Sequence, residues 1–416
     1  MLTSPLFKAV RSLNFGTDRR AEIQDIAPSE WPRLLTLTDR SHITLPLGIR
    51  CQEYLPQSIA ARIERNLADN SVRQERLFSE YRAIAEVLRA REIDFVVLKG
   101  MAHGAPFYVG DLRHRPQYDI DIYCPPVFLE SARQGMTAAG FLPVRSFDKR
   151  TDHLPAMMRN QNWRWRDDYY DPDLPLTVEI HFRFWDHRTE RLPASGVDAF
   201  WSRRTTCLVR GTPVPTLSLS DGVSYAAMHL VRHLLRGDLR IYHVYELAHF
   251  LHSTEADHEL WGQWLENRAG KPPIIDSVAF RLAIEWFGCS AHSIPAAAAR
   301  NLPRNVAKWF ELFCWSPLPS ERHNKDEVFL HLSLAEKHSD RCRIVARRLL
   351  PLKPPALINA IDAGAIPSRL HSVKALMRQL RFVTGRAVHH LKATLPLIQS
   401  LCRWVLFSGR YVARSS

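Results

Sequence analysis

A short segment in which acidic and apolar residues alternate constrains this chain more than any other feature. The segment reads Asp119-Ile120-Asp121-Ile122. Successive side chains of a β-strand point to opposite faces, so the two aspartates share one face and the two isoleucines share the other. Neighbouring carboxylates repel each other, so keeping both ionised costs free energy. Burial beside an apolar core raises this cost unless the carboxylates share a cation. The segment therefore predicts a half-buried strand whose polar face is a candidate site for a divalent metal ion.

An apolar run upstream of this segment ends at a glycine turn. Residues 95–98 read Phe-Val-Val-Leu and lead directly into Lys99-Gly100, a pattern that predicts a buried strand followed by a turn. Backbone N–H groups at such a turn, together with the start of a following helix, can hold phosphate oxygens. Arg115 adds a planar fork of donors shortly before Asp119. We therefore expect Lys99, Gly100 and Arg115 to bind phosphate groups.

A second alternating segment supplies a third carboxylate. Residues 176–184 predict a strand in which Glu179 and His181 share the polar face. We expect this strand to form a hairpin with residues 163–170 around a proline-containing turn at residues 171–175. Two carboxylates on one strand and one on its neighbour are suited to binding one or two Mg²⁺ ions for phosphoryl or nucleotidyl transfer. The pattern therefore favours this chemistry.

Asp119, Asp121 and Glu179 are the predicted metal ligands, and with His181 they form the predicted catalytic set. His181 is expected to orient a ligand or to act as a general base. The competing interpretation is that Asp119 and Asp121 only solvate an edge strand, because two aspartates at this spacing are a weak signal on their own. The glycine turn and Arg115 upstream favour metal binding.

Helical patterns surround this small β-rich region. Apolar residues recur at helical spacing in residues 71–91, and an apolar-rich segment covers residues 219–235. The order of helices, strands and helices predicts an α+β fold, in which a small mixed β-sheet is flanked by N- and C-terminal helical regions. The expected parts are an N-terminal helical region (1–90), a catalytic core (91–215), a helical domain (216–340) and a basic helical tail (341–416).

Taken together, these motifs resemble the pattern of a known protein family. The positions that carry the resemblance are Val97-Leu98-Lys99-Gly100, Tyr108, Arg115-Pro116, Asp119-Ile120-Asp121-Ile122 and Val178-Glu179-Ile180-His181-Phe182. They are similar to the LKG…Y…R…DIDLLV pattern and the lElHw strand of the uncharacterised nucleotidyltransferase family, which belongs to the polymerase-β-like nucleotidyltransferase superfamily. That family occurs in many bacterial surface-polysaccharide and peptide gene clusters. The resemblance covers about residues 70–255.

The resemblance implies a nucleotidyltransferase core that uses Mg²⁺ as cofactor and an NTP as substrate. It implies that Asp119 and Asp121 are the metal-binding pair, that Glu179 is the third carboxylate, and that Gly100 lies on the phosphate-binding turn. The implied reaction moves an NMP from the NTP to a small-molecule, sugar, lipid-linked or peptide acceptor. A role in polysaccharide biosynthesis is the corresponding expectation.

Two positions depart from the family pattern. Met101 follows Gly100 where the superfamily usually has a serine, so the turn offers no hydroxyl beside the triphosphate. Glu246 stands where the family frequently has an aspartate. The alternative function is a catalytically inactive scaffold that keeps the nucleotidyltransferase fold and docks on a membrane or on a partner.

Histidines and tryptophans outside these motifs are weaker candidates. His229 and His233 are one helical turn apart, a spacing that can bind zinc, although packed or hydrogen-bonded histidines are commoner. A third interpretation is that their helix closes over the active site and that one of them contacts substrate. Trp163, Trp165 and Trp185 lie around the predicted hairpin, where core packing is commoner than stacking on a base or a sugar.

The positive charge is concentrated at the C-terminal end. The chain has a formal net charge of +13, while residues 341–416 hold fourteen Lys and Arg and one acid, Asp362. The rest of the chain is therefore neutral overall, which argues against a nucleic-acid partner. Apolar residues alternate with the charges of the tail, and one interpretation is a basic amphipathic helix on an anionic membrane. RNA, an acidic partner and a solvated helical cap are the alternatives.

The sequence lacks the usual signals of an exported or membrane-spanning protein. Its seven cysteines are scattered without a CxxC pair, which argues for a reducing compartment. The N-terminal residues do not form a signal peptide pattern, and no run approaches the roughly 18 apolar residues of a membrane-spanning helix. We expect a cytoplasmic protein with peripheral contact to the inner face of the membrane through residues 341–416.

Overall fold

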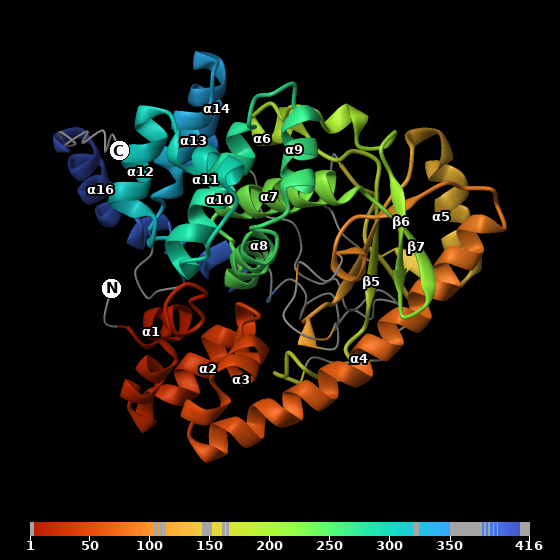
Figure 1. Ribbon diagram of the computed structural model, residues 1–416, viewed down its shortest axis with the longest axis horizontal. Helices are drawn as coiled ribbons and strands as arrows, with labels where there is room; N and C mark the ends of the chain where they lie inside the picture. Colours follow the sequence, from red (N-terminus) through yellow and green to blue (C-terminus); the bar gives the residue numbers. More distant parts are fainter. Residues whose placement is uncertain are drawn as a thin grey trace.

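The computed structural model of this chain is a mixed helical and sheet protein. The structure describes residues 4–103, 107, 111, 114–143, 152–159, 163, 166–318, 324–349, 377, 380, 381, 383–385, 387, 388 and 390–407. One seven-stranded mixed sheet lies beside a larger set of helices (Figure 1). The α+β fold predicted from the sequence is therefore confirmed.

In the described part of the chain, seven short strands form the sheet. They are β1 (Val96–Val97), β2 (Asp119–Tyr123), β3 (Phe141–Pro143), β4 (Met157–Arg159), β5 (Thr177–His181), β6 (Thr205–Val209) and β7 (Thr212–Thr216). Their order across the sheet is β3-β4-β5-β2-β1-β7-β6. β2 runs parallel to β5, and β1 runs parallel to β7, whereas the other neighbours are antiparallel. β2 and β5 therefore lie side by side in the interior of the sheet.

Helix α4 (Gln57–Arg89) and helix α5 (Leu129–Ala138) pack on the apolar face of the sheet (Figure 1). Leu77, Tyr81 and Ile84 of α4 are fully buried in the same cluster as Ile120 and Ile122 of β2. Burial of an aliphatic or aromatic side chain of this size is favourable by about 1.5–3 kcal/mol. This packing fixes which face of β2 turns to the core and leaves its aspartates on the opposite face.

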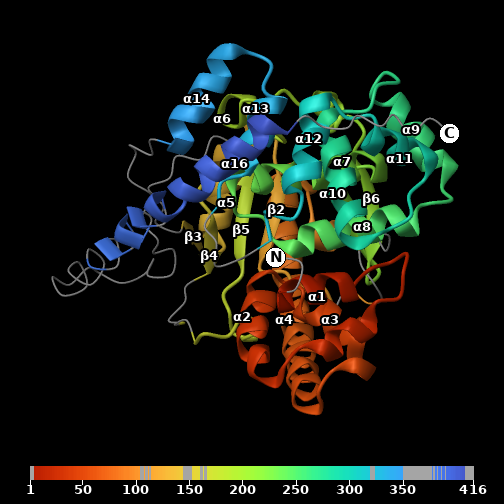
Figure 2. The ribbon, with the colours of Figure 1, turned by 90° about the vertical axis from the view of Figure 1, so that its left-hand side faces the viewer.

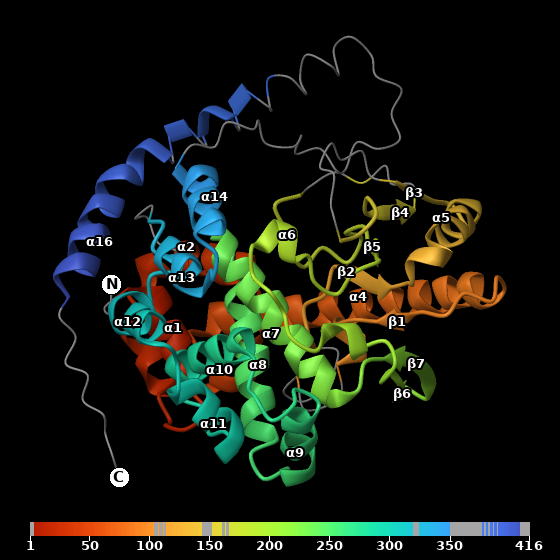
Figure 3. The same ribbon diagram turned by 90° about the horizontal axis from the view of Figure 1, so that it is seen from above.

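The remaining helices form the larger part of the molecule. Figure 2 shows the N-terminal helices α1, α2 and α3 together at one end, and Figure 3 shows the helical body beside the sheet. The most extensive apolar core lies among these helices. The helices are α1 (Pro5–Ser12), α2 (Trp31–Arg40), α3 (Thr44–Cys51), α6 (His187–Glu190), α7 (Leu219–Arg236), α8 (Ile241–Ser253), α9 (His258–Glu266), α10 (Ile274–Phe287), α11 (Ser293–Arg300), α12 (Arg304–Phe313), α13 (Glu327–Leu334), α14 (His338–Leu349) and α16 (Thr394–Leu406).

Helix α16 lies along the outside of the helical body (Figures 2 and 3). Its Trp404 stacks on Phe313 of α12 and on Phe329 of α13. Much of the predicted basic tail, including residues 350–376 and 408–416, lies outside the described residues. In the described part of the chain, no helix combines the length and the apolar character needed to cross a membrane.

The predicted hairpin between residues 163–170 and residues 176–184 is wrong. β5 pairs with β2 on one side and with β4 on the other, and the described residues of the first segment form no strand. The turn residues at 171–175 favour a chain reversal, but they carry no information about which strands will pair. The observed pairing places Glu179 directly beside Asp121.

Candidate active site

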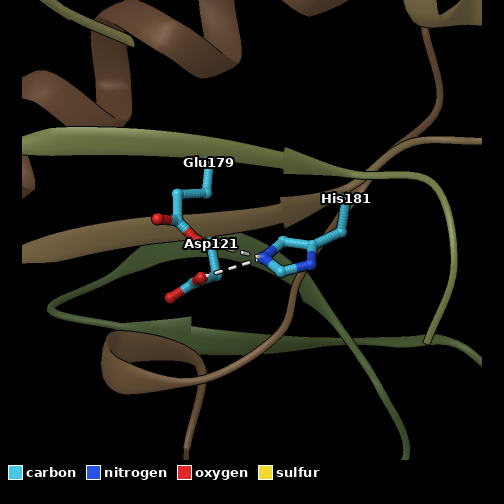
Figure 4. Close-up of side chains that lie close together, drawn as sticks. All are labelled: Asp121, Glu179 and His181. Carbon is cyan, nitrogen blue, oxygen red and sulfur yellow. Dashed lines mark hydrogen bonds and ion pairs between the residues drawn. The ribbon is translucent and has the colours of Figure 1, made fainter. Parts of the chain in front are cut away.

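The polar faces of β2 and β5 form one continuous surface. The parallel register pairs Asp121 with Glu179 and Tyr123 with His181. Alternating residues of a strand share a face, and paired residues of neighbouring strands point to the same side of the sheet. Asp121, Glu179 and His181 therefore project together from the face opposite to α4 (Figure 4).

Asp121, Glu179 and His181 are close enough to share one ion. Each offers a ligand atom, and these atoms all lie within 4.8 Å of one another. His181 Nε2 is 3.0 Å from Asp121 Oδ1 and 3.7 Å from Glu179 Oε2 (Figure 4). The side chains of Asp121 and His181 are buried, whereas that of Glu179 is 28% exposed. The group is therefore reachable from solvent on the side of Glu179.

Lys99 places a positive charge beside both aspartates of β2. Its Nζ lies 3.1 Å from Asp121 Oδ2 and 4.0 Å from Asp119 Oδ2. Lys99 follows β1, which pairs antiparallel with β2, and this pairing brings the lysine to the acidic face. Asp119 is partly exposed and does not belong to the group of ligand atoms within 4.8 Å. The structure thus brings Asp121, Glu179, His181 and Lys99 together, with Asp119 at their edge.

Two carboxyl groups of the site titrate in different pH ranges. Burial and the nearby carboxylates of Asp121 and Asp119 raise the pKa of Glu179 to about 7. Burial also disfavours ionised Asp121, but Lys99 and His181 outweigh that effect and hold the pKa of Asp121 well below its usual range. Perturbed pKa values of this kind concentrate at functional sites. The face therefore carries one firmly ionised carboxylate and one that titrates near neutral pH.

The donor atoms fit a divalent metal ion. The carboxylate oxygens of Asp121 and Glu179 suit Mg²⁺, and the imidazole of His181 is a better ligand for an ion such as Mn²⁺. Besides burial, repulsion between carboxylates raises the pKa of Glu179, and a bound cation would remove that repulsion. Asp119 lies outside this group of ligand atoms, so its predicted role as a metal ligand stays a prediction.

Gly100 forms the turn after β1 with a backbone φ of +70°. A Cβ atom there would lie 2.1 Å from Gln117 Nε2, so any larger residue requires the Gln117 side chain to move. Gln117 Nε2 also donates a hydrogen bond of 2.8 Å to the carbonyl oxygen of Asp119. Gln117 therefore packs against the glycine turn and bonds the backbone of β2. Met101, which replaces the usual serine of the superfamily, is buried in the core between the sheet and α4.

Arg115 is held by Glu246 of α8. Its Nε and Nη2 donate to Glu246 at 2.7 and 3.2 Å, and its Nη1 donates to Gln117 Oε1 at 3.3 Å. Burial opposes ionisation of Glu246, but the adjacent guanidinium lowers its pKa to about 2. Arg115 thus connects α8 to the glycine turn through Gln117. Its predicted contact with phosphate stays a prediction.

Sequence reasoning left Glu246 without a role. The signal that could have found it is the family's frequent aspartate at this position, because a buried acid on a later helix needs a basic partner. Sequence reasoning also missed His153, whose Nε2 lies 3.8 Å from Glu179 Oε2, and Asp152, which pairs with Arg232 of α7 at 2.9 Å. No alternating pattern marks the segment around His153, so its place at the site emerges only from the fold.

The described tryptophans at positions 163 and 185 contribute to packing. Trp185 is buried and donates from Nε1 to the carbonyl oxygen of Leu192. Trp163 donates from Nε1 to Asp171 at 2.9 Å. Trp165 lies outside the described residues.

The histidines of the predicted zinc pair lie on α7. His229 and His233 face each other one turn apart, and the structure adds His243 of α8 beside them. Zinc binding by the pair, and closure of this helix over the active site, stay predictions.

Comparison with known proteins returns one family. A family model described as an uncharacterised nucleotidyltransferase matches residues 27–288, which is more than half of the chain. The matched range includes the whole sheet together with α7 and α8. No curated protein and no solved structure matches the chain.

Proposed function

Because the chain belongs to the uncharacterised nucleotidyltransferase family, we propose that it moves an NMP from an NTP to an acceptor hydroxyl with the help of a divalent metal ion. One observation carries the proposal: the ligand atoms of Asp121, Glu179 and His181 lie within 4.8 Å of one another, with Lys99 beside them. Two carboxylates on adjacent strands suit in-line nucleotidyl transfer. The proposed acceptor is a small molecule, a sugar, a lipid-linked compound or a peptide, as in polysaccharide biosynthesis.

The predicted site residues of this face have separate proposed roles. Asp121 and Glu179 hold one or two Mg²⁺ ions, and Asp119 adds an oxygen at the edge. Bound Mg²⁺ supplies charge for the phosphates and lowers the pKa of the acceptor hydroxyl. His181 Nε2 faces both carboxylates, so we assign it to the metal or to the orientation of Asp121. Lys99 neutralises charge that develops on the phosphates.

The bonds that change follow from this arrangement. The acceptor oxygen bonds to the α-phosphorus while the bond from that phosphorus to the bridging oxygen breaks. Pyrophosphate leaves with that electron pair, and the acceptor proton passes to water on the exposed side of Glu179. The backbone at Gly100 is the proposed cradle for the phosphates, and Arg115 holds that turn in place through Gln117.

Isothermal titration of each NTP, in the presence of Mg²⁺ or Mn²⁺, tests the proposal. We expect metal-dependent binding to the wild-type chain and its loss in Asp121→Asn. Asp173→Asn is the matched control, because Asp173 is an exposed aspartate in the turn before β5. The mass of any product formed with candidate acceptors identifies the transferred group. Equal binding by wild type and Asp121→Asn, with no product from any NTP, would contradict the assignment.

A catalytically inactive scaffold is the second candidate. The observation that favours it is Met101, whose buried side chain replaces the hydroxyl usual in the superfamily. A scaffold of this kind shows no heat with any NTP, with or without metal, in wild type or in Asp121→Asn. The same titration therefore separates the two candidates.

We further propose that α16 contacts an anionic membrane surface. Leu397 and Trp404 pack this helix on the body. Other apolar side chains of the same helix, Leu395, Ile398, Leu401 and Val405, are between 49% and 69% exposed. A helix that leaves this many apolar side chains exposed offers them to a further covering surface. The excess of Lys and Arg in residues 341–416 favours anionic lipid as that surface.

Vesicle sedimentation tests the membrane contact. We expect the full chain to sediment with vesicles that contain anionic lipid, more weakly at high salt, and not with neutral vesicles. Leu401→Asp should lose binding, whereas Val127→Asp, at an exposed apolar residue far from α16 in the sequence, should keep it. Absence of binding to anionic vesicles contradicts the proposal. A dimer that Leu401→Asp dissociates would instead assign the face to a second copy of the chain.

A further inference from the structure

Three histidines on α7 and α8 gather outside the acidic group. The ring centroids of His229 and His233 lie 4.5 Å apart, those of His229 and His243 lie 4.7 Å apart, and those of His233 and His243 lie 5.4 Å apart. In a tetrahedral site with Zn–N distances of about 2.0–2.1 Å, the centres of two bound imidazoles are about 5 Å apart. The three rings therefore have the spacing of ligands to one ion.

His233 is oriented by a carboxylate. Its Nδ1 lies 3.0 Å from Asp238 Oδ1, just after the end of α7. A carboxylate that accepts from one ring nitrogen of a histidine fixes the tautomer in which the other nitrogen is free to bind a metal. Asp238 thus leaves Nε2 of His233 as the available donor.

The other two histidines have ring nitrogens that no hydrogen bond to a described residue occupies. Nδ1 of His243 is buried without a hydrogen-bond partner, and the ring of His229 forms no hydrogen bond with another described residue. Burial lowers the pKa of both histidines well below the usual value, and the positive charge of Lys99 lowers both further. Burial thus favours the neutral imidazole, which is the form that binds metals.

The ring nitrogens do not yet converge in this structure. Among the described residues, only Asp121, Glu179 and His181 present ligand atoms that all lie within 4.8 Å of one another. Binding by the histidine cluster therefore requires at least one imidazole to turn about its Cβ–Cγ bond. That torsion is broad for histidine.

We propose that His229, His233 and His243 bind one transition-metal ion of the Zn²⁺ type, with an open fourth position for water or a substrate oxygen. Three nitrogen donors favour Zn²⁺, Co²⁺ or Ni²⁺ and disfavour Mg²⁺, which prefers oxygen. The cluster and the acidic group on β2 and β5 use different residues and different donor chemistry. The proposal does not rest on the proposed nucleotidyl transfer.

Titration of the chelator-treated full chain with Zn²⁺ tests the proposal. The experiment is run in an Asp121→Asn background, so that the acidic group does not contribute. We expect one Zn²⁺ per chain and, with Co²⁺, the strong visible absorption of a tetrahedral site. His243→Ala should weaken Zn²⁺ binding at least tenfold, and Asp238→Asn should weaken it about 10- to 100-fold. His252→Ala, at a histidine of α8 that bonds Ser290 instead, is the matched control.

Three outcomes overturn the proposal. They are absence of Zn²⁺ binding in the Asp121→Asn background, binding by His243→Ala as tight as by the parent, and equal weakening by the His252→Ala control. Circular dichroism establishes that each variant is folded. If His243→Ala fails to fold, His233→Gln and Asp238→Asn decide the question, because these side chains lie nearer the surface.

Discussion

The ion pair between Arg115 and Glu246 predicts a large and pH-dependent loss of stability in Glu246→Gln. The pKa of Glu246 falls from an ordinary 4.5 to about 2 in the fold. Each unit of pKa corresponds to about 1.4 kcal/mol, so the ionised carboxylate contributes about 3 kcal/mol at pH 7. Loss of one partner from a buried pair costs about 3–5 kcal/mol in other proteins, which is the same range. We therefore expect the free energy of unfolding to fall by about 3 kcal/mol.

The sign of the pH dependence follows from the lowered pKa of Glu246. An acid with a depressed pKa in the fold stabilises the protein above its ordinary pKa, and this contribution is lost as the pH falls toward the lower value. The free energy of unfolding of wild type should therefore exceed that of Glu246→Gln by the full amount at pH 7. This difference should shrink to about half at pH 3 and vanish below about pH 2. Urea unfolding followed by tryptophan fluorescence at pH 7 and pH 3 measures this difference.

A surface pair provides the control for Glu246→Gln. Hydrogen bonds from Arg133 and Gln134 also lower the pKa of Glu130 to about 2, but that carboxylate is exposed, so solvent screens the pair and Glu130→Gln should change little. The double variant Glu246→Gln, Arg115→Met should lose less stability than the sum of the losses in the two single variants. A loss below about 1 kcal/mol at pH 7, or an equal loss at both pH values, would refute the electrostatic reasoning.

Three further predictions concern the acidic face and its turn. The fold raises the pKa of Glu179 to about 7, so the free energy of unfolding falls as the pH rises from 4.5 to 7. Glu179→Gln should therefore raise the melting temperature at pH 8 and leave it unchanged at pH 4. Gly100→Ala should destabilise the chain more than Gly140→Ala by urea unfolding, since both glycines have positive φ but only at Gly100 would a Cβ meet Gln117; equal losses would remove the steric argument. Mn²⁺ should bind the wild-type chain more tightly than Mg²⁺ by titration calorimetry, and His181→Ala should narrow that difference if the imidazole is a ligand.

The features that sequence predicts here are those with a local physical cause. Alternation in residues 119–122 fixes which side chains share a face of β2, because the period of a strand is two. Helical spacing in residues 71–91 likewise marks the side of α4 that turns to the sheet, and this agrees with the buried positions of that helix. Each pattern lies within a single strand or helix, so it can be recognised without knowledge of the fold.

The pairings between distant segments could not be predicted in this way. Glu179 reaches Asp121 because β5 aligns parallel with β2, yet the turn before β5 favoured a hairpin with a different segment. Arg115 and Glu246 are separated by 131 residues, and a charged residue in sequence does not reveal its partner across such a distance. Arg115 therefore looked free to bind phosphate, while the structure uses all three of its side-chain nitrogens internally.

Lys99 explains how the two aspartates of β2 coexist, and it links metal binding to nucleotide binding in the proposed reaction. Burial disfavours its ammonium, but Asp121 and Asp119 outweigh burial and raise its pKa, so Lys99 stays charged. It therefore neutralises the face before any other cation arrives. In the proposed reaction, a triphosphate that drew Lys99 away would free Asp121 Oδ2 to hold a metal ion, and a metal ion held by Asp121 would free Lys99 for phosphate. Linkage then requires each ligand to increase the affinity for the other by the same factor.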